Sequence, residues 1–150
     1  MHTSNQSKLM KAWIGVWISG ISGSGKTTVG NLLARELRCG IRNSDDDRYR
    51  QYIVGRTPQE TADIMAAEAG AIFSVWTSLT FPAREGFLKV GLFCPARIAM
   101  SRKPSGYSAW LEGGLGGQTL DRWPGLEGAH VVLDGTRTVS QIVAAIKEQL

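Results

Sequence analysis

The chain has 150 residues, 43% of them hydrophobic and 20% charged, and its formal net charge is +4. This length suits one compact domain with one core, and the composition is ordinary for a globular protein. The arginines are scattered rather than gathered into a basic arm, and no apolar run approaches the roughly 18 residues of a membrane span. We therefore expect neither nucleic acid nor a membrane among its partners.

The N-terminus and the cysteines indicate where the protein works. Residues 1–12 lack the apolar core of a signal peptide, so we expect a disordered lead-in followed by a single domain over residues 13–150. Cys39 and Cys94 are far apart and lack the spacing of a metal site. We expect two buried free thiols in a cytoplasmic protein.

The predicted elements begin with a short apolar run of strand length over residues 13–19. From Lys26 the apolar residues recur at helical spacing as far as Leu37. Gly40 follows, and we expect it to end this helix as a C-terminal cap. A second short strand is predicted around Ile41.

The middle of the chain continues the alternation. The stretch T-P-Q-E at residues 57–60 has the pattern of a capping box and predicts a helix that stops at Gly70. Apolar runs over 71–80 and 88–94 predict buried strands, and residues 95–102 a short helix.

The last part of the chain begins with a Gly-rich, Pro-punctuated stretch over residues 103–128, which we expect to be a lid. A strand is predicted over 130–134, and Thr138 is expected to cap a final helix through Gln141. Alternating strands and helices predict an α/β fold, in which a parallel sheet carries helices on both faces.

One predicted connection is unusually short. Only residues 81–87 separate the strand that ends near Thr80 from the strand that starts at Leu88. Two parallel strands normally need a crossover of roughly a dozen residues. Either the crossover helix is drastically shortened, or residues are missing from the chain.

The clearest motif is G-I-S-G-S-G-K-T at residues 20–27, the phosphate loop, which matches G-x-x-x-x-G-K-[ST] in full. Its glycines let backbone N–H groups approach phosphate oxygens, and the helix that follows adds the positive end of its dipole. Lys26 would reach the β- and γ-phosphates, and the Thr27 hydroxyl could coordinate Mg²⁺. The motif predicts a P-loop NTPase-type fold that binds ATP and Mg²⁺ through Gly20, Ser22, Gly23, Ser24, Gly25, Lys26, Thr27 and Thr28.

Three acids, Asp45, Asp46 and Asp47, follow the second predicted strand. Phosphoryl transfer needs a carboxylate to orient Mg²⁺ or to accept the proton of the acceptor hydroxyl. We predict that Asp45 and Asp47 are catalytic together with Lys26, and that Thr27 and one of the two acids, Asp45 in our assignment, hold the metal. The alternative is that Ser44 or Asp45 caps a short helix and the other acids are solvated.

Several segments, in the same order along the chain, resemble the adenylylsulfate kinase (APS kinase) family of P-loop kinases. The stretch W-I-S-G-I-S-G-S-G-K-T-T is very like the phosphate-loop signature of that family. The other matches are D-D-D-R-Y-R at 45–50 with D-G-D-x-x-R, S-L-T-F-P-A-R at 78–84 with F-I-S-P-x-R, R-K-P-S-G-Y at 102–107 with R-D-P-K-G-L, and V-L-D-G at 132–135 with V-L-D-T.

This resemblance implies a single P-loop kinase domain, ATP as the phosphate donor, and a homodimer, since members of the family usually dimerise. It implies that Arg102 packs on the adenine of ATP and that Gly135 lies beside the base. Arg50 would grip the acceptor, with Arg56 and Arg84 as further candidates to hold a small anionic acceptor.

The chain also departs from the family pattern. The N-I-R-R helix of the family is replaced here by G-R-T-P-Q-E-T-A-D at residues 55–63, and the lid lysine is Ser105. The donor half is therefore well matched and the acceptor half poorly. The resemblance implies phosphorylation of the 3′-hydroxyl of adenylylsulfate, in sulfate activation. The alternatives are a related kinase with another acceptor, such as a different nucleotide or a sugar acid, and a nucleotide-binding module without transfer activity.

Overall fold

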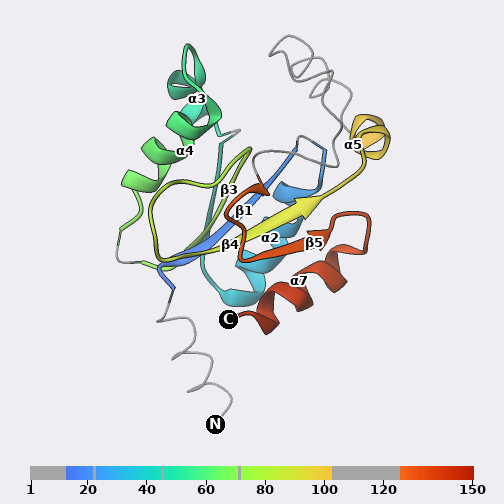
Figure 1. Ribbon diagram of the computed structural model, residues 1–150. Helices are drawn as coiled ribbons and strands as arrows, with labels where there is room; N and C mark the ends of the chain where they lie inside the picture. The colour runs from blue at the N-terminus through green and yellow to red at the C-terminus, as the bar shows by residue number, and fades with distance from the viewer. Residues whose placement is uncertain (1–12, 22, 45, 71, 103–125) are drawn as a thin grey trace.

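The computed structural model describes residues 13–150 except residues 22, 45, 71 and 103–125. The predicted lead-in over 1–12 and most of the predicted lid lie outside the described residues. Within them, five parallel strands form one sheet in the order β2-β3-β1-β4-β5 (Figure 1). The strands are β1 (Gly15–Gly20), β2 (Gly40–Asn43), β3 (Ser74–Ser78), β4 (Phe87–Phe93) and β5 (Val131–Asp134).

The helices lie on both faces of this sheet, which confirms the predicted α/β architecture. They are α2 (Lys26–Leu37), α3 (Asp47–Ile53), α4 (Pro58–Ala67), α5 (Ala96–Arg102) and α7 (Val139–Glu148). None of these described helices is both long and apolar enough to cross a membrane.

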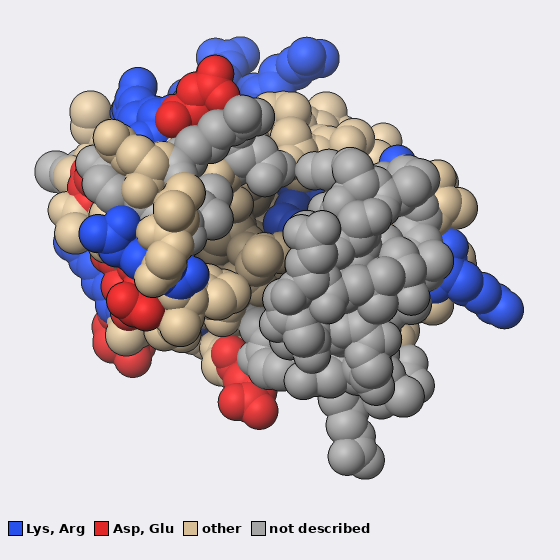
Figure 2. All heavy atoms as spheres, turned by 90° about the horizontal axis from the view of Figure 1, so that it is seen from above, with Lys and Arg blue, Asp and Glu red and all other residues tan. Residues whose placement is uncertain are grey.

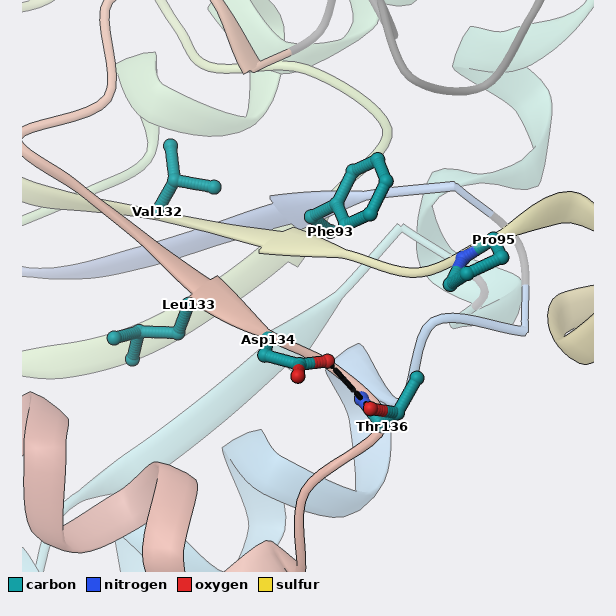
Figure 3. Close-up of a pocket in the computed structure, with 6 residues that line it drawn as sticks. All are labelled: Phe93, Pro95, Val132, Leu133, Asp134 and Thr136. Atoms are coloured by element: carbon teal, nitrogen blue, oxygen red, sulfur yellow. Dashed lines mark hydrogen bonds between the residues drawn. The ribbon is translucent and has the colours of Figure 1, made fainter.

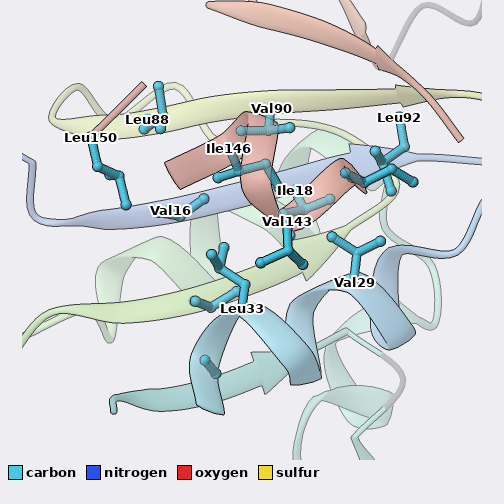
Figure 4. Packing of buried hydrophobic residues seen from close by; sticks show 13 residues of the cluster. Val16, Ile18, Val29, Leu33, Leu88, Val90, Leu92, Val143, Ile146 and Leu150 are labelled. Carbon is cyan, nitrogen blue, oxygen red and sulfur yellow. The ribbon is translucent and has the colours of Figure 1, made fainter. Parts of the chain in front are cut away.

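The larger core lies between the sheet and the helices α2 and α7 (Figure 4). Val16 and Ile18 of β1 point into it, and Leu33 of α2 and Ile146 of α7 meet them there, all fully buried. The side chains of a strand alternate between the faces of a sheet, so Trp17, which lies between Val16 and Ile18, faces the other way.

The second core covers the opposite face and is built from aromatic side chains. Trp17 stacks on Trp76 of β3 with ring centroids 5.3 Å apart, and Phe87 of β4 meets Trp17 edge-on at 5.0 Å. Met65 of α4 and Tyr49 of α3 are fully buried against this cluster. Burial of these large side chains fixes α4, and with it α3, beside the sheet.

Both predicted capping boxes are present. Thr57 and Glu60 exchange hydrogen bonds at the start of α4, and Thr138 and Gln141 do so at the start of α7. The predicted end of α2 is wrong. The left-handed cap is Arg38, with φ 55°, and Gly40 already belongs to β2, because the amides of Arg38 and Cys39 close the last turn of the helix.

The short connection between β3 and β4 contains no helix in this structure. Residues 79–86 return across β1 as an irregular segment, which is long enough because an extended chain advances ~3.3 Å per residue. Helix α4 holds this segment: Gln59 donates to the carbonyl of Phe81 over 3.0 Å, and the amide of Ala83 donates to Asp63 over 2.7 Å. A shortened crossover therefore closes the sheet with the residues present.

The two cysteines are free, as predicted, but only Cys94 is fully buried, while Cys39 is half-buried. Burial raises the pKa of both thiols. Both therefore stay protonated at neutral pH, and neither is a reactive thiolate.

Candidate active site

The phosphate loop joins the end of β1 to the start of α2, as the motif predicts. Gly23 has φ 86° and Gly25 has φ 100°, a left-handed conformation that glycine adopts without strain. A Cβ at Gly23 would also lie 2.3 Å from the carbonyl oxygen of Ala99 in α5. The backbone can therefore turn tightly around an anion only with glycine at these positions.

The positive charge of the site comes from Lys26 and from the N-terminus of α2. The Lys26 amine donates to the carbonyl oxygens of Gly20 over 2.8 Å and Ile21 over 3.1 Å, so it lies across the loop. The first turn of α2 holds no acidic residue, and the side chains of Thr27 and Thr28 are exposed there. The helix dipole and the ammonium group thus act together on a ligand at this point.

Ser24 lies inside the loop and is fully buried. Among the described residues, its Oγ is the one buried side-chain oxygen or nitrogen without a hydrogen-bond partner. A buried hydroxyl in this state usually marks a place where a partner from outside the protein chain is expected. Together with the two left-handed glycines, it indicates that the cradle suits a polar ligand.

Two segments distant in sequence pack against the outer side of the loop. A Cβ at Gly135, after β5, would lie 2.9 Å from the carbonyl oxygens of both Ser24 and Phe93. The guanidinium of Arg102, in the last turn of α5, donates to the Gly135 carbonyl over 3.1 Å. The structure therefore brings Arg102 and Gly135, both predicted ATP-binding residues, to the phosphate loop.

A pocket of about 420 Å³ lies at the carboxyl ends of β4 and β5 (Figure 3). Its lining consists of Phe93, Pro95, Val132, Leu133, Asp134 and Thr136. Asp134 accepts hydrogen bonds from the hydroxyl of Thr136 over 2.6 Å and from its amide over 2.9 Å, and these bonds hold the pKa of Asp134 below its usual value. An apolar pocket with one carboxylate beside the phosphate loop suits a small molecule.

Sequence analysis did not find this pocket. Phe93 and Asp134 end two different strands, and only the strand order shows that these strands are neighbours. The V-L-D-G stretch was the single signal for it.

The acceptor side of the predicted site is built by α3. Asp46 is the N-cap of this helix and accepts from the amide of Arg48 over 3.0 Å, so the prediction that Ser44 or Asp45 caps it is wrong. Asp47 is exposed in the first turn. Asp45, Ser22 and the side chain of Arg50 lie outside what the structure describes.

The two remaining predicted acceptor residues lie apart from each other. Arg56 is exposed between α3 and α4. Arg84 donates to the carbonyl oxygens of Ala66 over 2.8 Å and Ala69 over 3.0 Å, at the C-terminus of α4, where helix carbonyls attract a cation. This is the edge at which the strands begin, because the amide of Ile14, just before β1, bonds to nearby Gly86. The structure thus places Arg84 away from the phosphate loop, and its predicted acceptor role is not retained.

Seen from above in Figure 2, the surface is hollowed, and a Lys or Arg side chain lies at the bottom of the hollow. Among the described residues, no group of three His, Cys, Asp or Glu side chains could hold a metal ion by itself. Mg²⁺ is commonly bound by one or two carboxylates together with substrate phosphates, so Thr27 and the acids at 45 and 47 remain its candidate ligands.

Comparison with known proteins supports the same fold. No protein-family model matches the chain. It is 27% identical over 139 residues to a probable adenylyl-sulfate kinase of Archaeoglobus fulgidus, over 77% of this chain and 86% of the relative. The resemblance to APS kinases is confirmed by this relative.

Solved structures of two kinases superpose on nearly the whole chain. A shikimate kinase of Acinetobacter baumannii has a TM-score of 0.65 at 18% identity, over 93% of this chain and 94% of that chain. An APS kinase of Mycobacterium tuberculosis, solved with AMPPNP and APS, has a TM-score of 0.62 at 17% identity, over 90% and 95%. The fold is that of the P-loop kinases. At these identities, the P-loop kinase fold is all that the structural likeness establishes.

Proposed function

We propose that this protein is an ATP-dependent kinase that transfers the γ-phosphoryl group to a hydroxyl of a small anionic acceptor. The observation that carries the proposal is the complete phosphate loop, with left-handed Gly23 and Gly25 and with Lys26 across its mouth. The chain's likeness to an adenylyl-sulfate kinase supports adenylylsulfate, phosphorylated at its 3′-hydroxyl, as the first acceptor to test.

The donor side would act by positioning and by charge. The amides of the phosphate loop and the N-terminus of α2 would hold the β- and γ-phosphates, and Lys26 would turn from the loop carbonyls to the transferring group. Thr27 and an acid from Asp45 or Asp47 would hold Mg²⁺, which neutralises phosphate charge. Arg102 and Gly135 would complete the ATP site.

The acceptor side would act through α3. One carboxylate, Asp47 or Asp45, would orient the acceptor hydroxyl and accept its proton. Arg50 and Arg56 would hold the anionic group of the acceptor. By the same resemblance, we assign the protein to sulfate activation in the cytoplasm, as a homodimer.

A second candidate function keeps the donor site and changes the acceptor. It is supported by the departure from the APS kinase pattern at residues 55–63. It is also supported by the close superposition on a shikimate kinase, whose acceptor is a small hydroxy acid. A nucleotide-binding module without transfer is the third candidate.

The experiment is ADP release with Mg·ATP and a panel of acceptors: adenylylsulfate, other nucleotides, shikimate and sugar acids. Turnover with adenylylsulfate alone supports the first candidate, and turnover with another acceptor selects the second. ATP binding without turnover on any acceptor selects the module. The Lys26→Ala variant provides the background rate, which separates transfer by this site from contaminating kinases.

A further inference from the structure

The guanidinium of Arg102 contacts the phosphate loop through main-chain carbonyls. Its Nη1 lies 3.1 Å from the carbonyl oxygen of Gly135 and 3.4 Å from those of Gly23 and Ser24. We propose that Arg102 is a positioning residue of the phosphate loop, which holds these carbonyls outward so that the loop amides face the phosphates. The proposal rests on the donor site described under the proposed function.

The argument begins with the geometry of one peptide. The C=O of Ser24 and the N–H of Gly25 belong to the same trans peptide unit and point in opposite directions. Arg102 holds the Ser24 carbonyl on the outer side of the loop. The Gly25 amide is thereby directed to the inner side, where the predicted ATP phosphates would lie.

The surroundings of the loop leave Arg102 this role. Helix α5 packs its Ala99 backbone against Gly23, and the turn after β5 packs Gly135 against Ser24. The loop is thus pressed from two sides by elements that follow β4 and β5. The guanidinium sits where these elements meet, and it is the charged group that joins the carbonyls of both.

An arginine suits this position better than a lysine. Three carbonyl oxygens surround one end of the side chain, and a guanidinium presents several N–H donors in a rigid plane. It also adds a positive charge behind the loop, which strengthens the attraction for phosphate. Lysine would keep the charge but would replace the fixed fork with a flexible point charge.

This role differs from packing on adenine in a measurable way. A side chain that stacks on the base contributes to ATP binding and not to the binding of a ligand without a base. A side chain that shapes the loop contributes to both equally. Inorganic tripolyphosphate with Mg²⁺ therefore separates the two roles.

The test is calorimetric titration of wild type, Arg102→Ala and Arg102→Lys with ATP and with inorganic tripolyphosphate. We expect Arg102→Ala to weaken both ligands by the same factor, about tenfold, and Arg102→Lys to lie between it and wild type. Arg97→Ala is the matched control, because Arg97 is an exposed arginine on the same helix, and its affinities should stay those of wild type.

Loss of ATP affinity alone, with tripolyphosphate unchanged, would overturn the proposal in favour of base stacking. Unchanged affinity for both ligands would overturn it as well, while the donor site itself would stand. Failure of wild type to bind either ligand would remove the donor site and this proposal with it.

A second readout needs no ligand. Hydrogen exchange at the Gly25 amide, followed by NMR in the free protein, should become at least several-fold faster in Arg102→Ala while the exchange of β1 amides stays unchanged. Equal exchange at Gly25 in both proteins would contradict the proposal. Faster exchange throughout β1 would also contradict it, since the side chain would then support the fold at large.

Discussion

The donor and acceptor sides of the site differ in how they are built. The phosphate loop is enclosed by α5 and by the turn after β5, and Ser24 at its centre is fully buried. On the acceptor side, Asp47 and Arg56 are exposed, and α3 is a short helix capped by Asp46. The donor side is therefore constrained by packing, while the acceptor side consists of charged groups at the surface.

This difference indicates which substitutions each side tolerates. A packed loop shaped by left-handed glycines allows few sequences, so its residues can be identified from a short motif. An exposed charged side chain can be supplied from several positions, so its identity says little about the acceptor. The following predictions test whether the two sides differ in this way.

The largest effect is expected at the centre of the donor side. We predict that Lys26→Ala abolishes phosphoryl transfer, because charge on the transferring group loses its nearest cation. The measurement is coupled ADP release with the acceptor found in the panel. Lys147→Ala, which removes a surface lysine paired with Glu36 over 3.0 Å, should keep the wild-type rate. Wild-type rates in Lys26→Ala would sink the mechanism.

The next effect is expected at the predicted catalytic acid. We predict that Asp47→Asn lowers the transfer rate at least a hundredfold, since an amide cannot accept the proton of the acceptor hydroxyl. ATP affinity, measured by calorimetry, should change little. The neighbouring Asp46→Asn keeps a good N-cap and is expected to remain active. If Asp46→Asn is the inactive variant, the catalytic assignment moves by one residue.

The packing of the donor side can be tested with a methyl group. We predict that Gly135→Ala weakens ATP binding about tenfold, because its Cβ would lie 2.9 Å from two backbone carbonyls, one of them in the phosphate loop. Gly70→Ala is the control, since nothing lies within 4 Å of a Cβ at that position. Equal affinity in the two variants, by calorimetry, would show that the loop yields and that the donor side is not tightly constrained.

The smallest effect separates two arginines. We predict that Arg84→Ala destabilises the fold by about 1 kcal/mol through its lost bonds to the carbonyls of Ala66 and Ala69, with an unchanged KM for the acceptor. Arg56→Ala should leave stability unchanged and raise that KM. The measurements are thermal unfolding and steady-state kinetics. A raised KM in Arg84→Ala would return this residue to the acceptor site.

Much of the architecture could be predicted from the sequence, because its signals are local. The phosphate loop needs glycine at fixed positions, and both capping boxes need their residues three apart, so each is legible in a few letters. The end of α2 was mispredicted because arginine, against its usual preference, adopts the left-handed cap at Arg38.

The tertiary structure decided what depends on contacts between distant segments. Arg84 lies within a family-like motif, but its position is set by the C-terminus of α4, fifteen or more residues earlier in the chain. The pocket between β4 and β5 exists because these strands are neighbours in the sheet. The contact of Arg102 with the phosphate loop joins residues far apart in sequence. The sequence by itself determined the cradle for a phosphate, since backbone conformation is a local property, whereas the enclosure of that cradle depends on long-range packing.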